Sequence, residues 1–192
     1  TSITIPEGIE RIGSLAFAEC SSLTSITIPK TVTQIDCGGI WIGNNYYIGH
    51  LFTYCPCLTS IVVEEGNPRY KSIQNGNGII DKTTNTLIAG DQTTIIPKDV
   101  INIGEYAFAR CDALTSITIP DSVTKIGAYA FNGCTALTTL DLPENLTEIP
   151  QYMANRTALT SLVIPDKVTT IGEHAFQECT DLKTITFSQG LT

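Results

Sequence analysis

The sequence predicts an α/β solenoid, a right-handed superhelix of short stacked coils that each contain one strand and one short helix. Two observations lead to this prediction. One segment recurs about every 23 residues along the chain, and each copy changes from an alternating apolar and polar pattern to a helical spacing. A periodic chain of this kind folds by stacking each unit on its neighbours.

The period is marked by prolines that follow a short apolar stretch. Pro6 and Pro29 are 23 residues apart, and the same interval separates Pro97, Pro120 and Pro143. Proline lacks a backbone N–H donor, so it ends strand pairing. One coil cannot bury its own apolar edge, whereas stacked coils pair their strands at about 4.8 Å per coil. The repeat therefore predicts one parallel sheet along the solenoid.

The alternating stretch of each coil reads as a half-buried strand. In the second copy, Ile26 and Ile28 are expected to point into the core and Thr27 outward. A glycine follows the next apolar stretch, as at Gly104 and Gly127. At these positions we expect either a positive φ or close packing of the backbone.

The rest of each coil has the spacing of a short helix. In the first copy, Ala16, Cys20 and Leu23 stand at i, i+4 and i+7, with Phe17 beside Ala16. That spacing gives about two helical turns with one buried stripe. We therefore expect a short helix on the convex side of every coil.

The full pattern is Leu-x-x-Ile-x-Ile-Pro-x-x-Val-x-x-Ile-Gly-x-x-Ala-Phe-x-x-Cys-x-x-Leu. It resembles the BspA-like group of leucine-rich repeats and covers nearly the whole chain. The resemblance implies a single leucine-rich-repeat domain over residues 1–192, as a fragment of a longer array. It also implies an extracellular or cell-surface location, because such proteins are mostly bacterial surface or secreted proteins. A role in adhesion or ligand binding is implied too, but no catalytic residue, because the motif is architectural.

Residues 36–51 interrupt the second coil with twelve additional residues. Two short apolar and aromatic runs flank Gly43-Asn44-Asn45, which predicts a hairpin. The hairpin carries Trp41, Tyr46 and Tyr47, and insertions in solenoids often form the binding face. These rings are candidate ligand contacts. The alternative is that they only cover the edge of the core.

Residues 64–94 replace the third coil. A second hairpin is expected where two apolar runs bracket residues 82–85. Asn67, Pro68 and Tyr70 precede it and are similar to a variant coil of the same repeat group. We interpret them as structural residues.

The outward positions of the strands are a second candidate binding surface. Thr27, Thr118 and Asp141 are the residues selected there, on a face expected to be small and polar. A Thr-rich strand face is also what β-propensity alone would produce. Their composition therefore does not separate a binding site from a plain surface.

The seven cysteines divide into two groups. Five share one repeat position and are expected to be buried, unreactive thiols. Cys37 and Cys57 fall outside that position and lie next to the first insertion. A disulfide between them would clamp the loop, and two free thiols are the alternative.

Motifs for catalysis and cofactor binding are missing. The sequence contains no nucleophile elbow, dinucleotide-binding fingerprint, phosphate-binding loop or zinc-protease motif. His50, Cys55 and Cys57 could supply three zinc ligands, but no fourth is evident. We predict a protein that is not an enzyme and has no metal or cofactor.

The charge distribution excludes two classes of partner. The net charge is −8 and no basic stripe exists, which argues against nucleic acid. No apolar run is long enough to insert into a membrane. The remaining hypotheses are a recognition or adhesion module for a protein or glycan at a cell surface, and a passive spacer or scaffold that carries another domain.

Overall fold

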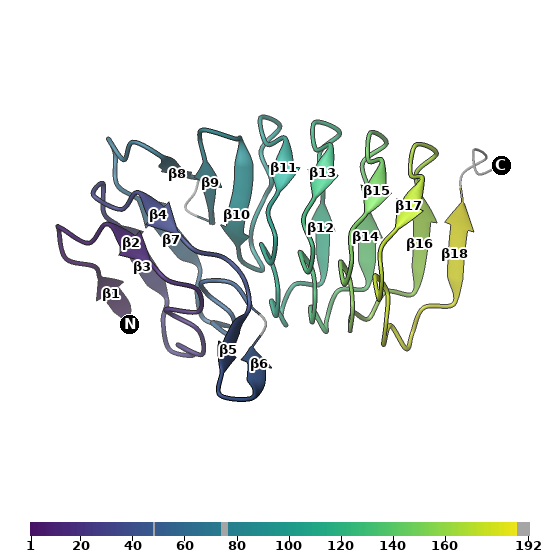
Figure 1. The fold of residues 1–192 in the computed structure, drawn as a ribbon, viewed down its shortest axis with the longest axis horizontal. Helices are drawn as coiled ribbons and strands as arrows, with labels where there is room; N and C mark the ends of the chain where they lie inside the picture. The colour runs from purple at the N-terminus through teal and green to yellow at the C-terminus, as the bar shows by residue number, and fades with distance from the viewer. Residues whose placement is uncertain (48, 74–76, 188–192) are drawn as a thin grey trace.

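The coils lie side by side along one axis, with the N-terminus at one end and residue 187 near the other (Figure 1). This arrangement comes from a computed structural model. The structure describes residues 1–47, 49–73 and 77–187. All its regular elements in these ranges are strands, and none of the described residues forms a helix that could cross a membrane.

The alternating stretches form a first row of strands. The members of this row are β1 (Ser2–Thr4), β3 (Ser25–Ile28), β7 (Ser60–Val63), β12 (Ser116–Thr118), β14 (Thr139–Asp141), β16 (Ser161–Ile164) and β18 (Thr184–Phe187). Every pairing within the row is parallel, and Ile3, Ile26 and Ile61 are in register. The buried Ile26 and Ile61 confirm the predicted inward face.

The prediction of one continuous parallel sheet is wrong. Among the described residues, the first row divides into β1-β3-β7, β12-β14 and β16-β18. Between β7 and β12 the regular coil is replaced by antiparallel strands, which break the ladder. Between β14 and β16 the proline spacing is 22 residues rather than 23, and these strands are neighbours without a complete ladder.

A second row of two-residue strands follows each turn. Its members are β2 (Arg11–Ile12), β4 (Gln34–Ile35), β11 (Asn102–Ile103), β13 (Lys125–Ile126), β15 (Glu148–Ile149) and β17 (Thr170–Ile171). They pair in parallel as β2-β4, β11-β13 and β15-β17. Proline before each of these stretches keeps them short and separate from the first row.

The predicted convex helices are not formed in the part of the chain that the structure describes. These segments are consecutive turns, as in residues 105–110. Tyr106 and Arg110 have φ values of 60° and 63°, and this left-handed conformation interrupts a helix. Alternate N–H groups donate to the next coil instead, as Phe108 N does to Ala130 O at 2.8 Å. Stacking of coils has replaced local helical bonding.

Both predicted hairpins are confirmed. β5 (Ile40–Ile42) and β6 (Asn45–Tyr47) pair antiparallel and extend away from the stacked coils (Figure 1). β9 (Gly78–Asp81) and β10 (Thr86–Gly90) also pair antiparallel, and β8 (Tyr70–Ser72) adds a third strand beside β9. β10 then pairs in parallel with β11, which returns the chain to the regular stack.

Asn67 has the structural role expected of the variant coil. Its buried side chain donates to Pro29 O at 3.0 Å and Val32 O at 2.9 Å. Its Oδ1 atom accepts from the N–H groups of Arg69 and Tyr70. Two of the four bonds of this buried amide therefore tie the coil to the preceding one, and the other two fix the local turn.

The core consists of two clusters rather than one. The first contains buried side chains between Ile12 and Ala89, and the second contains those between Ile73 and Ala175. In each cluster, phenylalanines of adjacent coils stack, with ring centroids 6.2 Å apart for Phe17–Phe52 and 5.3 Å for Phe108–Phe131. The replaced third coil lies at the boundary between the clusters.

Candidate functional site

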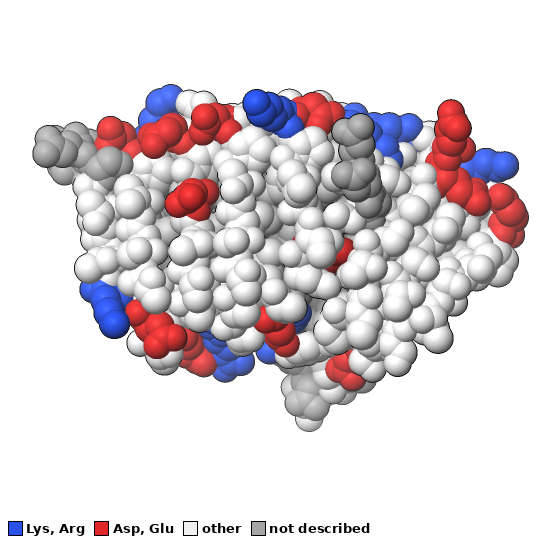
Figure 2. All heavy atoms as spheres, turned by 180° about the vertical axis from the view of Figure 1, so that it is seen from behind, with Lys and Arg blue, Asp and Glu red and all other residues white. Residues whose placement is uncertain are grey.

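The outward side of the first row is a broad and almost uncharged surface. The register places Thr27 between Thr4 and Val62, and it places Thr118 beside Asp141. Thr27 is half-buried, whereas Thr118 and Asp141 are exposed. Figure 2 shows one face of the molecule, on which Lys and Arg occur only near the borders. We call the outward side of the first row the strand face.

The strand face is less polar than expected. Half of the eight coils have threonine at the outward repeat position, and three have a β-branched aliphatic side chain there. Val62 on β7 is 41% exposed, Val163 on β16 is 60% exposed, and Ile95, which occupies the same position in a coil without an assigned strand, is 75% exposed. The three side chains are spread along the row, with Thr118 and Asp141 at the equivalent positions between Ile95 and Val163. Sequence reasoning missed these three residues, although the position between the two apolar residues of each strand was the signal that could have identified them.

The first hairpin has the predicted strand pairing, but the structure does not test whether its aromatic residues contact a ligand. Trp41 pairs with Tyr46 across the hairpin, while the side chains of both lie outside the described residues. Tyr47 is 44% exposed. A binding role for these three rings therefore stays a prediction.

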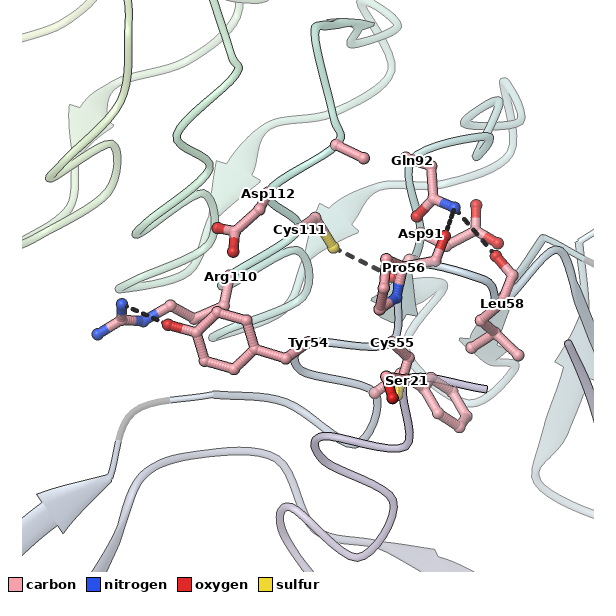
Figure 3. Close-up of a pocket in the computed structure, with 13 residues that line it drawn as sticks. Ser21, Tyr54, Cys55, Pro56, Leu58, Asp91, Gln92, Arg110, Cys111 and Asp112 are labelled. Atoms are coloured by element: carbon pink, nitrogen blue, oxygen red, sulfur yellow. Dashed lines mark hydrogen bonds between the residues drawn. The ribbon is translucent and has the colours of Figure 1, made fainter. Parts of the chain in front are cut away.

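A cavity of about 190 Å³ lies at the boundary between the two core clusters. Tyr54, Cys55 and Pro56 form one wall, while Cys111 and Asp112 face them from the other (Figure 3). The lining surface as a whole is mostly apolar. The remaining lining residues are Ser21, Phe52, Leu58, Gly90, Asp91, Gln92, Arg110 and Ala113. The cavity exists because the replaced third coil leaves the regular turns of the two halves imperfectly packed.

Polar contacts across the boundary hold the cavity walls together. Arg110 Nη1 donates to Tyr54 Oη at 2.8 Å, with the guanidinium 5.6 Å from the ring centroid. Gln92 Nε2 donates to the carbonyl oxygens of Pro56 and Leu58 at 3.2 and 3.1 Å. These contacts join residues from the two halves of the chain.

His50 crosses the same boundary inside the core. Its Nδ1 accepts from Phe52 N at 3.3 Å, and its Nε2 lies 3.6 Å from the Cys111 sulfur. An accepting Nδ1 fixes the neutral tautomer with hydrogen on Nε2, so the Cys111 thiol can donate to Gly90 O. Sequence reasoning considered His50 only as a zinc ligand and missed its burial against Cys111, because one histidine in an insertion gives no periodic signal.

The His50–Cys111 pair has the composition of a nucleophilic dyad but the wrong electrostatics. Complete burial lowers the pKa of His50 to about 3 and raises the pKa of Cys111 well above its usual value. A reactive cysteine needs the opposite, a depressed thiol pKa and a histidine that can accept its proton. The pair is a structural contact between the two halves.

Two carboxyl groups beside the cavity also have shifted pKa values. Desolvation raises the pKa of Asp91, even though Thr93 and Thr94 donate to its Oδ1 atom. Desolvation likewise raises the pKa of Asp112. No cluster of three or more metal-ligating side chains occurs among the described residues, so His50, Cys55 and Cys57 are not brought together as ligands.

The cysteines are all unpaired. Cys37 is half-buried and donates to Ile88 O at 3.5 Å, while Cys57 is exposed, and both are free thiols in this structure. Burial raises the pKa values of Cys37 and Cys134 to about 12 and of Cys55 to about 11, which suppresses their thiolate forms.

Thiol labelling without reductant should separate these cysteines. We expect Cys57 to react rapidly in the folded protein and the buried thiols to react only after denaturation. Mass spectrometry of the denatured, labelled chain should find a label at all seven cysteines. A Cys37–Cys57 peptide that stays linked and unlabelled would contradict the structure.

A known repeat family matches most of the chain. The family described as BspA type leucine-rich repeat region matches residues 1–38 and 91–192, in six copies. The unmatched interval, residues 39–90, contains both hairpins. Among curated proteins, none matches the chain.

Solved structures of bacterial proteins share the fold. The pneumococcal vaccine antigen PcpA has a TM-score of 0.74 and 25% identity, over 95% of this chain and 43% of the antigen. A leucine-rich cell surface protein from Faecalibacterium prausnitzii has a TM-score of 0.72 and 26% identity, over 97% of this chain and 59% of that one. This chain thus spans about half the length of these two proteins. A leucine-rich repeat protein from Bacteroides capillosus has a TM-score of 0.53 and 29% identity, over 61% of this chain and 98% of that one.

Proposed function

This chain belongs to the BspA-type leucine-rich repeat family, and from that premise we propose that it is a non-catalytic recognition module that binds a protein through its strand face. The exposed aliphatic residues Val62, Ile95 and Val163 carry the proposal. The family motif fixes the buried side of each strand and leaves the outward residue free to vary. A protein ligand would remove the apolar surface of these outward side chains from water.

We further propose that the module acts at a bacterial cell surface. Support comes from the similar Faecalibacterium protein, which is described as a cell surface protein. The nearly uncharged strand face is bordered by charged residues, which fits an apolar contact area surrounded by a polar rim (Figure 2). A passive spacer is the competing function, and it requires no ligand.

Replacing the aliphatic residues of the strand face should weaken protein binding by about ten-fold or more. The probes are immobilised purified extracellular-matrix proteins and a glycan array, with binding of the intact chain measured by biolayer interferometry and fluorescence. The test variant combines Ile95→Thr and Val163→Thr, which remove apolar surface from two exposed strand-face positions. Ile101→Thr is the matched control, because Ile101 is 42% exposed but precedes β11 of the second row and does not occupy the outward repeat position of Ile95 and Val163.

Several outcomes would overturn the proposal. Equal losses in the control and test variants would show that the strand face is not the site. Binding to glycans alone would exclude a protein ligand, and binding to no probe would favour the spacer. Loss of binding in Trp41→Ala, with the strand-face variant unaffected, would assign recognition to the first hairpin instead.

A further inference from the structure

A hollow of about 260 Å³ opens on the strand face between β14 and β16. One wall is formed by β14 and the residues that directly follow it. The other wall is formed by β16 and Pro165. The lining residues are Leu140, Asp141, Leu142, Glu144, Val163 and Pro165. The hollow thus combines an aliphatic surface with two carboxylates.

The two carboxylates of the hollow have no cationic partner in the described part of the chain. Asp141 and Glu144 are exposed, and neither takes part in an ion pair there. Lys167, on the turn after β16, donates to Asn145 Oδ1 at 2.6 Å. Lys167 thus binds Asn145, and Figure 2 shows Lys and Arg only near the edges of this face, so the negative charge is available to a partner.

The aliphatic wall is equally available. Val163 is 60% exposed, and it occupies the same repeat position on β16 as Asp141 does on the neighbouring β14. Leu142 is half-buried and packs on the second core cluster, which fixes the floor of the hollow. A ligand group that fits here needs an apolar stem and a cationic end.

We propose that this hollow accepts an arginine side chain of the protein ligand, with its methylene groups on Val163 and its guanidinium between Asp141 and Glu144. The inference rests on the proposed function of the strand face and names the chemistry of its partner. An arginine stem buries well against aliphatic surface, and its planar guanidinium can donate to two carboxylates at once. Lysine would offer only a compact, strongly hydrated charge to the same groups.

A pair of short peptides tests the charge preference directly. The probes are acetyl-Thr-Val-Arg-Val-Thr-amide and its citrulline counterpart, which has nearly the same shape without the charge. Titration of the isotope-labelled chain, followed by amide chemical shifts, should show changes at residues 140–144 and 163–165. We expect the arginine peptide to bind about five-fold more tightly, the upper range for exposed ion pairs, and the difference to shrink at high salt.

Substitutions in the hollow provide the matched comparison. Asp141→Asn should weaken binding of the arginine peptide about two-fold, because Glu144 keeps its share of the attraction, and leave the citrulline peptide unchanged. Glu148→Gln is the control, because Glu148 is an exposed carboxylate on β15, outside the first row. Equal binding of the two peptides, shift changes away from the hollow, or equal effects of the two substitutions would overturn the inference.

The same variants separate this inference from the proposed function. If a protein ligand loses affinity with Ile95→Thr and Val163→Thr but not with Asp141→Asn, the strand face binds protein without an arginine in the hollow. If none of these substitutions affects the protein ligand, the proposed function fails as well.

Discussion

Gly127→Ala is expected to lower the free energy of unfolding by about 3 kcal/mol, although it adds only one methyl group. An added Cβ at Gly127 would lie 2.4 Å from Glu105 N and 2.7 Å from Gly104 C, both backbone atoms of the preceding coil. Backbone cannot move aside as a flexible side chain can, so the coils must separate. Urea denaturation followed by circular dichroism measures the loss.

The same repeat position offers a matched control at the N-terminal coil. An added Cβ at Gly13 would meet no atom within 4 Å, because no described coil precedes it. Gly13→Ala should therefore change the stability by less than about 0.5 kcal/mol. Gly172→Ala should behave like Gly127→Ala, since its Cβ would lie 2.4 Å from Gln151 N. Equal effects at Gly13 and Gly127 would show that the coils are not stacked this closely.

Acidification from pH 7 to pH 5 is expected to cost about 2 kcal/mol of stability through His50. Burial lowers the pKa of His50 to about 3 in the folded chain, against 6.5 for a solvated histidine. The unfolded chain therefore binds the proton first. The stabilisation is complete above pH 6.5 and is lost as the pH falls toward 3. Urea denaturation at both pH values measures this loss.

His50→Gln should abolish that pH dependence while keeping a polar side chain at the boundary. His174→Gln is the control, because His174 is the other histidine of the chain and is exposed. Asp91 and Asp112 have raised pKa values, so their titration acts in the opposite direction at lower pH. If His50→Gln is as sensitive to pH as the unsubstituted chain, the buried neutral histidine is not responsible.

Strand register and insertion length were predictable because they follow from spacing. Ile26 pairs with Ile61, which is 35 residues away, or one 23-residue period plus the 12 inserted residues. The turn residues Gly43 and Asn44 identified the first hairpin for a local reason, the backbone conformation that such a turn needs.

The conformation of the convex segments was not predictable from apolar spacing. Ala130, Cys134 and Leu137, at the same i, i+4 and i+7 spacing, are buried in a series of turns and would be buried in a helix as well, so the spacing does not distinguish the two conformations. Positive φ at non-glycine residues such as Tyr106 carries a local cost of about 1 to 2 kcal/mol that only the neighbouring coils offset. The sequence pattern of a single coil contains no information about that compensation.

The candidate site was predictable only in part, for a similar reason. The outward direction of Thr27, Thr118 and Asp141 followed from strand alternation. The hollow beside Asp141 depends on how two adjacent coils meet, and the contact between His50 and Cys111 joins residues 61 positions apart. Neither the hollow nor this contact recurs from coil to coil, so the repeat pattern could not predict them.

The most direct test of coil stacking is a through-hydrogen-bond scalar coupling measured by NMR on the labelled, deuterated chain. In the structure, Phe108 N donates to Ala130 O in the next coil at 2.8 Å. We therefore expect a coupling between the Phe108 amide nitrogen and the Ala130 carbonyl carbon. A coupling from Phe108 to the carbonyl carbon of Gly104, as an α-helix requires, would contradict the account.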